Sequence, residues 1–168
     1  MKNHKAIFML AAFVLGLGMQ AFAQEVLPEI TVKAVRYKYL SAVDQKELAQ
    51  PVKMLQKQAA EYDVKKSDFY EDEYDTYFIS FFIPQGEILA TYDQDGKLLR
   101  TAEKYKNVAL PKAVTKAVMD RFPQWIIAED AYLVNYYEES GAKKVYKLTL
   151  QNGDKRLKVK LNEKGEFI

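Results

Sequence analysis

Apolar and polar residues alternate over short segments of this chain, and only tight turns separate many of these segments. Residues 156–161, Arg-Leu-Lys-Val-Lys-Leu, alternate without a break, so a strand there has one apolar and one basic face. The Asn152-Gly153 pair just before them is the strongest short signal for a hairpin turn. Because consecutive strands joined by tight turns pair antiparallel, this pattern constrains much of the chain to an antiparallel sheet.

The same pattern predicts the remaining strands. Strands are expected at residues 77–83, 87–92, 97–101, 125–137, 144–151 and 156–162, with a short end at 166–168. Gly86, Gly96, Gly141 and Gly165 mark turns that bound them. Residues 77–83 are apolar on both faces, which indicates either a central strand with a covered second face or an open apolar face.

Two amphipathic helices are predicted, at residues 51–62 and 111–122, and each has proline in its first turn. Val52, Leu55 and Ala59 form the apolar face of the first helix, while Gln56 is assigned to its polar side. Before this helix, apolar residues alternate with polar ones, so residues 24–43 are predicted to be an extended N-terminal segment.

Each predicted helix precedes a meander of strands, and the turns that close the two meanders also match. We interpret this as a tandem duplication with copies at about 44–103 and 104–168. The alternative is that two unrelated helix–hairpin units have similar helix-start and turn residues. The expected fold class is α+β, in which helix-plus-antiparallel-meander repeats form one sheet with two helices packed on one face.

Residues 1–23 have the three parts of a secretory signal peptide. Lys2 and Lys5 precede an apolar run, and Ala21-Phe22-Ala23 fits the signal-peptidase motif, so cleavage is expected before Gln24. The run is shorter than the ~20 residues of a spanning helix, so we expect no stable membrane insertion after cleavage; a membrane anchor is the alternative. The protein is therefore predicted to be periplasmic or secreted.

Composition excludes several function classes for the exported part. The chain has no cysteine, and its one histidine, His4, lies in the predicted signal, so Ser-His-Asp triads and His or Cys zinc sites are excluded. The 25 Lys and Arg and 23 Asp and Glu become 23 of each once Lys2 and Lys5 are removed. This zero net charge disfavours a nucleic-acid partner. We predict no catalytic residues, no metal and no cofactor.

Four motifs together carry a family resemblance. They are Tyr92-Asp93-Gln94-Asp95-Gly96-Lys97, Leu110-Pro111-Lys112-Ala113-Val114, Phe122-Pro123 and the closing segment 161–168. In this order they make residues 44–168 resemble the PepSY-like domains of exported bacterial proteins, which share a fold type with the tandem β-lactamase-inhibitor-protein domains. The resemblance implies a non-enzymatic periplasmic or secreted domain that binds protein or peptide. It supplies no functional residues to carry over.

Tyrosine is abundant, with 12 residues, all after position 23. Tyr and Trp suit binding surfaces, because they offer large, rigid contact areas with a polar group. The predicted partner-binding face comprises Trp125, Tyr132, Tyr136, Tyr137, Lys147, Arg156, Lys158 and Lys160. The alternative is that these aromatic residues fill the core, which alternation favours for Tyr146.

The acidic residues give weaker signals. Asp93-x-Asp95-Gly96 resembles the start of a calcium loop but lacks the downstream glutamate, so a hairpin turn is favoured. Two acidic pairs, Glu129/Asp130 and Asp72/Asp75, could serve a glycosidase, although nothing in the sequence places either in a cleft.

The predicted function is an exported, non-enzymatic binding module that holds a protein or peptide partner of the cell envelope on an open aromatic sheet face. Inhibitory and chaperone-like roles fall within this prediction. The alternatives are a small carboxylate-based envelope enzyme and an envelope ligand or ion sensor. The sequence does not determine the partner, the oligomeric state or which sheet face is exposed.

Overall fold

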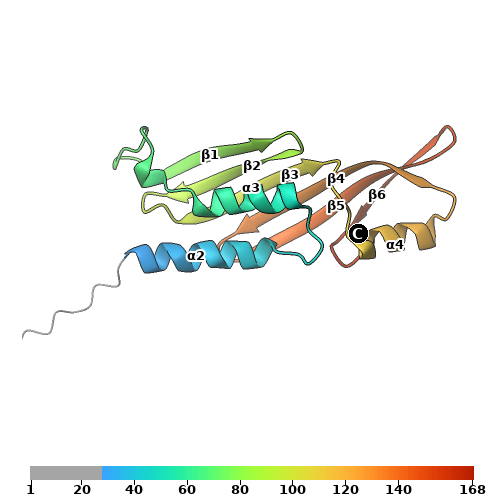
Figure 1. The fold of residues 1–168 in the computed structure, drawn as a ribbon, viewed down its shortest axis with the longest axis horizontal. Helices are drawn as coiled ribbons and strands as arrows, with labels where there is room; N and C mark the ends of the chain where they lie inside the picture. Colours follow the sequence, from blue (N-terminus) through green and yellow to red (C-terminus); the bar gives the residue numbers. More distant parts are fainter. Residues whose placement is uncertain (1–27) are drawn as a thin grey trace, which may run out of the picture.

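In the computed structural model, a six-stranded antiparallel sheet is combined with three α-helices over residues 28–168, the part of the chain that the structure describes (Figure 1). The strands follow chain order across the sheet: β1 (Thr76–Ile83), β2 (Gly86–Asp93), β3 (Leu98–Lys106), β4 (Ile126–Tyr137), β5 (Gly141–Asn152) and β6 (Lys155–Leu161). The α+β fold with an antiparallel sheet is therefore confirmed. The predicted signal peptide lies outside the described residues.

The predicted extended segment at 24–43 is wrong over the residues that the structure describes. Residues Pro28–Val43 form helix α2. The buried residues Tyr39 and Val43, with Leu40 partly buried between them, follow helical spacing. The alternation of apolar and polar residues favoured a strand, but packing of the helix onto the sheet overrides that local pattern.

The two predicted helices are present as α3 (Gln50–Glu61) and α4 (Lys112–Arg121), and a single 3₁₀ turn, η2 (Val64–Lys66), follows α3. Helix α3 packs on β1 and β2, whereas α2 packs on β3, β4 and β5. Helix α4 lies near the chain end (Figure 1), where Gly165, at φ +83°, passes close to Ala113. The unpredicted α2 thus occupies the sheet beside α3, and the duplication stays a prediction.

Strand β1 lies at the edge of the sheet, so the structure excludes the central strand, one of the two alternatives for residues 77–83. Strand β3 continues to Lys106, five residues beyond the predicted end at Thr101. The prediction stopped early because the inward positions after Leu99 include the polar residues Thr101 and Glu103, which interrupt the apolar alternation.

Tyrosine side chains fill much of the layer between the sheet and the helices. Six are fully buried, with relative exposure below 2%: Tyr39, Tyr92, Tyr105, Tyr132, Tyr136 and Tyr146. The rings of Tyr105, Tyr132 and Tyr146 stack across β3, β4 and β5, with centroid separations of 5.9 and 4.6 Å. Because such large side chains carry polar hydroxyls, this core requires internal hydrogen-bond partners.

The carboxylate of Glu103 is the main such partner. It lies on β3 and is only 3% exposed. Its Oε1 accepts hydrogen bonds from Tyr39 Oη and Thr101 Oγ1, both at 2.8 Å. Its Oε2 accepts from Gln56 Nε2 at 2.8 Å and from Tyr105 Oη at 2.9 Å. One side chain therefore ties α2 and α3 to the middle of the sheet. The assignment of Gln56 to the polar side of its helix is wrong, because Gln56 is buried to reach this carboxylate.

Burial raises the pKa of Glu103 above its ordinary value, because the ionised carboxylate is kept from water. The four hydrogen bonds oppose this shift, since each stabilises the charged form. The pKa values of Tyr39 and Tyr105 are also raised, first by burial and then by the negative charge of Glu103 beside them. All three groups therefore hold their protons more tightly than they would in water.

Replacing Glu103 by alanine is expected to lower the free energy of unfolding by about 3 kcal/mol or more. The change leaves two tyrosine hydroxyls, a threonine hydroxyl and an amide without their common acceptor. Urea unfolding measures it, with Glu87→Ala on the exposed side of β2 as the control, for which a change within about 0.5 kcal/mol is expected. Equal effects of the two substitutions would contradict the role given to Glu103.

The raised pKa of Glu103 also predicts a pH dependence. The folded state binds the Glu103 proton more tightly than the unfolded state, whose carboxyl titrates near its ordinary value of 4.5. The stability due to this proton is therefore complete below that value and is lost as the pH rises through the raised pKa.

We expect the difference in unfolding free energy, wild type minus Glu103→Gln, to be greatest at about pH 4 and to fall toward about pH 7. Glutamine stays neutral throughout, and the other titrating groups are common to both proteins. Urea titrations at several pH values measure the difference. A difference that rises with pH would mean that the pKa of Glu103 is lowered by folding.

Candidate functional site on the open face of the sheet

The two faces of the sheet have different surroundings. One face packs under α2 and α3 and carries the buried tyrosines. The other face, called the open face below, is formed by the alternate residues. At its β1 and β2 end, Phe78 and Phe82 are 69% and 68% exposed, and Leu89 is also exposed. Of the two interpretations of residues 77–83, the structure therefore supports an open apolar face.

The open face is hollowed at the β3 to β6 end. This basic hollow has a volume of about 540 Å³. Its side walls include four lysines from three strands: Lys106 of β3, Lys147 of β5, and Lys158 and Lys160 of β6. Its polar lining is completed by Glu129 and Asp130 of β4, Thr149 of β5, and Asn107.

Strand register explains why these side chains meet. Lys106 pairs with Ala131, Ala131 with Lys147, and Lys147 with Lys160, which makes one row across four strands. The neighbouring row runs from Glu129 through Thr149 to Lys158. Alanine in the middle of a row of lysines leaves room that a longer side chain would fill. The hollow is thus bounded by long basic side chains around a short one.

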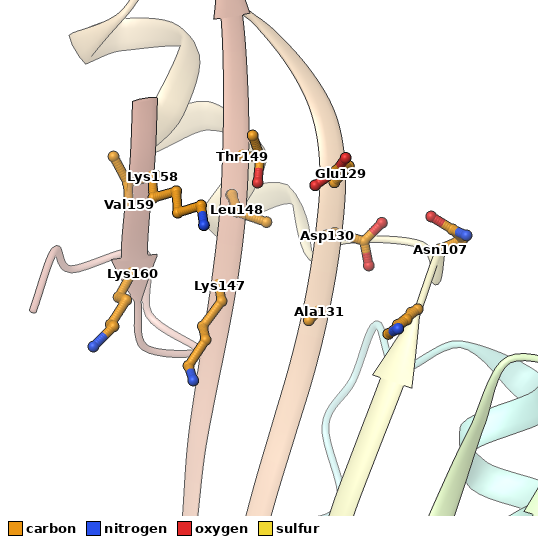
Figure 2. Close-up of a pocket in the computed structure, with 11 residues that line it drawn as sticks. Asn107, Glu129, Asp130, Ala131, Lys147, Leu148, Thr149, Lys158, Val159 and Lys160 are labelled. Carbon is orange, nitrogen blue, oxygen red and sulfur yellow. The ribbon is translucent and has the colours of Figure 1, made fainter. Parts of the chain in front are cut away.

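Figure 2 shows the two rows from close by. Lys147 and Lys160 extend in the same direction from neighbouring strands, and Lys158 reaches from β6 toward Thr149. Like charges directly opposite on paired strands repel each other. No salt bridge among residues 28–168 involves any of the four lysines of the hollow. Of the two acids that line the hollow, Glu129 lies 3.7 Å from Arg156 Nη1, and Asp130 accepts a hydrogen bond from the backbone nitrogen of Val108. The hollow therefore has a local excess of positive charge.

Glu129 and Asp130 lie next to each other on β4 and point to different sides (Figure 2). Asp130 is partly buried and accepts a hydrogen bond from the backbone nitrogen of Val108 at 3.2 Å. Its pKa is raised, mainly by burial. A pair of carboxylates that diverges in this way cannot flank one glycosidic bond, as a glycosidase requires.

The structure brings only part of the predicted partner-binding face together on one surface. Lys147, Arg156, Lys158 and Lys160 lie on the open face as expected. Tyr137 is also there, 44% exposed, with the guanidinium of Arg100 5.2 Å from its ring centroid.

The predicted exposure of Tyr132 and Tyr136 is wrong, since both are fully buried on the helix-covered face. Helix α2, which was not predicted, covers this part of the sheet. Trp125 is partly buried, and its ring lies 6.3 Å from that of Phe122 at the end of α4. It therefore packs against the core instead of joining the lysines.

Sequence reasoning missed Lys106 and Ala131 as members of the site. The missing signal was the length of β3. Had alternation been continued past Thr101, Lys104 and Lys106 would have fallen on the same face, opposite Glu103 and Tyr105. Ala131 carries no recognisable signal of its own, because only the register shows that it lies between two lysines.

The other acidic candidates lie in turns and loops. Asp93 closes the turn between β2 and β3, where its Oδ1 accepts hydrogen bonds from the backbone nitrogens of Asp95 and Lys97 at 3.0 and 2.8 Å. Asp72 and Asp75 are exposed before β1. Across the described residues, no group of three or more potential metal ligands was found. None of the helices described here has the length and apolar character needed to span a membrane.

Comparisons of the chain with protein-family models, with curated proteins and with solved structures found no match. The candidate site is therefore argued from its own geometry.

The adjacent tyrosines Tyr136 and Tyr137 allow the two faces to be tested separately. Tyr136→Ser is expected to lower the free energy of unfolding by about 3 kcal/mol or more, because it empties a fully buried position. Tyr137→Ser is expected to cost about 1 kcal/mol or less, since its ring lies on the open face. Tyr136→Phe is expected to change stability little, because no residue within 28–168 bonds the buried Tyr136 hydroxyl. Chemical unfolding of the three variants measures this, and equal losses for both serine variants would contradict the assignment.

Proposed function

We propose that this protein is an exported, non-enzymatic binding module that holds a protein or peptide partner on the open face of its sheet. The observation that carries the proposal is the basic hollow, in which four lysines outnumber the two acidic residues of the lining and form no salt bridge among the described side chains. The partner is proposed to place acidic side chains in this hollow.

Charge complementarity supports this choice of partner. Carboxylates placed among the lysines would relieve the repulsion between Lys147 and Lys160, which lie opposite each other on paired strands. Ala131 and Thr149 leave space between the lysines for such groups. The volume of about 540 Å³ falls within the range of ordinary ligand sites, so several acidic side chains could enter together.

The alternative functions have less support from the geometry. Glu129 and Asp130 diverge, and Glu103 is buried under the helices with all its hydrogen bonds made within the core. A carboxylate-based enzyme would need two acids that converge on one cleft. A sensor of a small anion would use the same hollow, and the experiment below distinguishes it from a peptide binder.

The other parts of the proposal come from sequence. Export follows from the signal-peptide pattern of residues 1–23. Membership of a PepSY-like family is proposed on the order of the motifs between Tyr92 and Ile168, and the binding of protein or peptide is what that resemblance implies. A periplasmic or secreted location would give such a module access to partners in the cell envelope.

The proposal predicts that a short glutamate-rich peptide binds the protein and that reversing charges in the hollow weakens this binding. Lys147→Glu/Lys160→Glu is expected to reduce affinity about tenfold or more, because two attractive contacts become repulsive. Fluorescence anisotropy with a labelled peptide measures the affinity. Binding is also expected to weaken as salt is added, because the lysines are exposed.

The matched control is Lys46→Glu/Lys164→Glu, which makes the same change in net charge at exposed positions outside the hollow. Its affinity should stay close to that of the wild type. Equal weakening in both double variants would mean that net charge alone attracts the peptide and would contradict the proposed site. Binding of free glutamate or citrate as tight as that of the peptide would favour the sensor.

A further inference from the structure

The two edge strands of the sheet are protected very differently. Strand β6 has the sequence Lys-Arg-Leu-Lys-Val-Lys-Leu, so four of its seven residues are basic. Strand β1, Thr-Tyr-Phe-Ile-Ser-Phe-Phe-Ile, is eight residues long and has no charge. Natural sheets guard their edges with charges, prolines or bulges, because an unguarded edge pairs with other strands. Strand β1 has none of these guards along its length, and its register with β2 is continuous.

The backbone of β1 offers four positions for pairing. Ile83 and Gly86 flank a two-residue loop and therefore form a hydrogen-bonded pair of the β1–β2 ladder. Positions alternate along an antiparallel ladder, so Thr76, Phe78, Ser80 and Phe82 direct their N–H and C=O groups away from β2. On that side the strand order of residues 28–168 has no neighbour (Figure 1).

We propose that β1 pairs antiparallel with β1 of a second copy of this chain, about a two-fold axis at Ser80. In this register Ser80 lies opposite Ser80 of the second copy. Phe78 of each copy lies opposite Phe82 of the other. Phe78, Ser80 and Phe82 then meet outward positions, so every free N–H and C=O among these three gains a partner, while Thr76 at the start of the strand lies opposite Pro84. A symmetric interface of this kind is self-complementary, as a two-fold dimer requires.

Side chains favour the same register. Phe78 and Phe82 are the most exposed large apolar residues of β1, at 69% and 68%, and both project from the open face. Pairing at Ser80 sets each phenylalanine opposite one from the other copy, and cross-strand aromatic pairs stabilise a sheet. Centring on Phe82 would place Ser80, in the middle of the strand, opposite Pro84, which has no N–H to donate, whereas centring on Ser80 places only the first residue, Thr76, there. Pairing about Ser80 is therefore the register that forms two phenylalanine pairs.

The dimer would join two six-stranded sheets into one continuous sheet. The basic hollow is built from β3 to β6, away from β1, so each copy keeps its hollow. The inference therefore does not depend on the proposed binding function, and variants of β1 test it separately.

Disulfide trapping tests both the interface and its register, because the chain has no cysteine of its own. In the proposed pairing the two Ser80 Cα atoms are about 5.5 Å apart, within the range of a disulfide. Ser80→Cys is expected to give a covalent dimer in mild oxidant, visible on a non-reducing gel. Phe82→Cys is expected to stay monomeric on the gel, since its two copies lie four residues apart along the strands, about 14 Å.

Sedimentation of the variant Ser80→Lys gives an independent measurement. Ser80 is exposed, so lysine leaves the monomer fold intact but opposes two charges at the two-fold axis. We expect the wild type to form a dimer whose population rises with concentration and Ser80→Lys to remain a monomer. Asn135→Lys, exposed on the central strand β4, is the control and should dimerise as the wild type does.

Three results would overturn the inference. These are a wild type that is monomeric at every concentration, a dimer that persists in Ser80→Lys, and a covalent dimer of Phe82→Cys as abundant as that of Ser80→Cys.

Discussion

The buried carboxylate of Glu103 connects the parts of this fold. Its two oxygens accept hydrogen bonds from α2, from α3 and from two further residues of β3, so the helices and the sheet share one polar centre. A buried carboxylate without such donors would be very costly, and four donors without a common acceptor would be costly as well. The arrangement therefore requires both helices to dock in one position relative to β3. The tyrosine core forms around that position.

Docking of the helices decides what the rest of the sheet can do. Once α2 and α3 cover the face that carries Tyr105, Tyr132 and Tyr146, the alternate residues must face away from them. Those residues are phenylalanine at the β1 end and lysine at the β6 end. The open face therefore has an apolar region and a basic region, separated by the width of the sheet. The basic region contains the proposed peptide site, and the apolar region contains the strand edge of the proposed dimer.

In the candidate site, strand register brings together charged residues whose clustering the overall composition does not reveal. The part of the chain predicted to be exported has no net charge, yet four lysines meet around Ala131 because three strand pairings place them in two adjacent rows. A local excess of charge can steer and hold an oppositely charged partner even when the whole protein is neutral. Two acids, Glu129 and Asp130, also line the hollow, but the lysines outnumber them.

The sequence by itself determined the antiparallel sheet, two of the helices and the basic side of β6, because these depend on alternation, helical spacing and turn residues that act locally. It also indicated that Tyr146 belongs to the core. Only the tertiary structure decided that residues 28–43 form α2, that Tyr132 and Tyr136 lie beneath it, and that β3 extends through Glu103 to Lys106. The physical reason is common to all three. A helix whose residues alternate like a strand, tyrosine hydroxyls in a core and a carboxylate inside a strand are each unexpected from the local sequence. They become stable through packing on the sheet and hydrogen bonds made in the core.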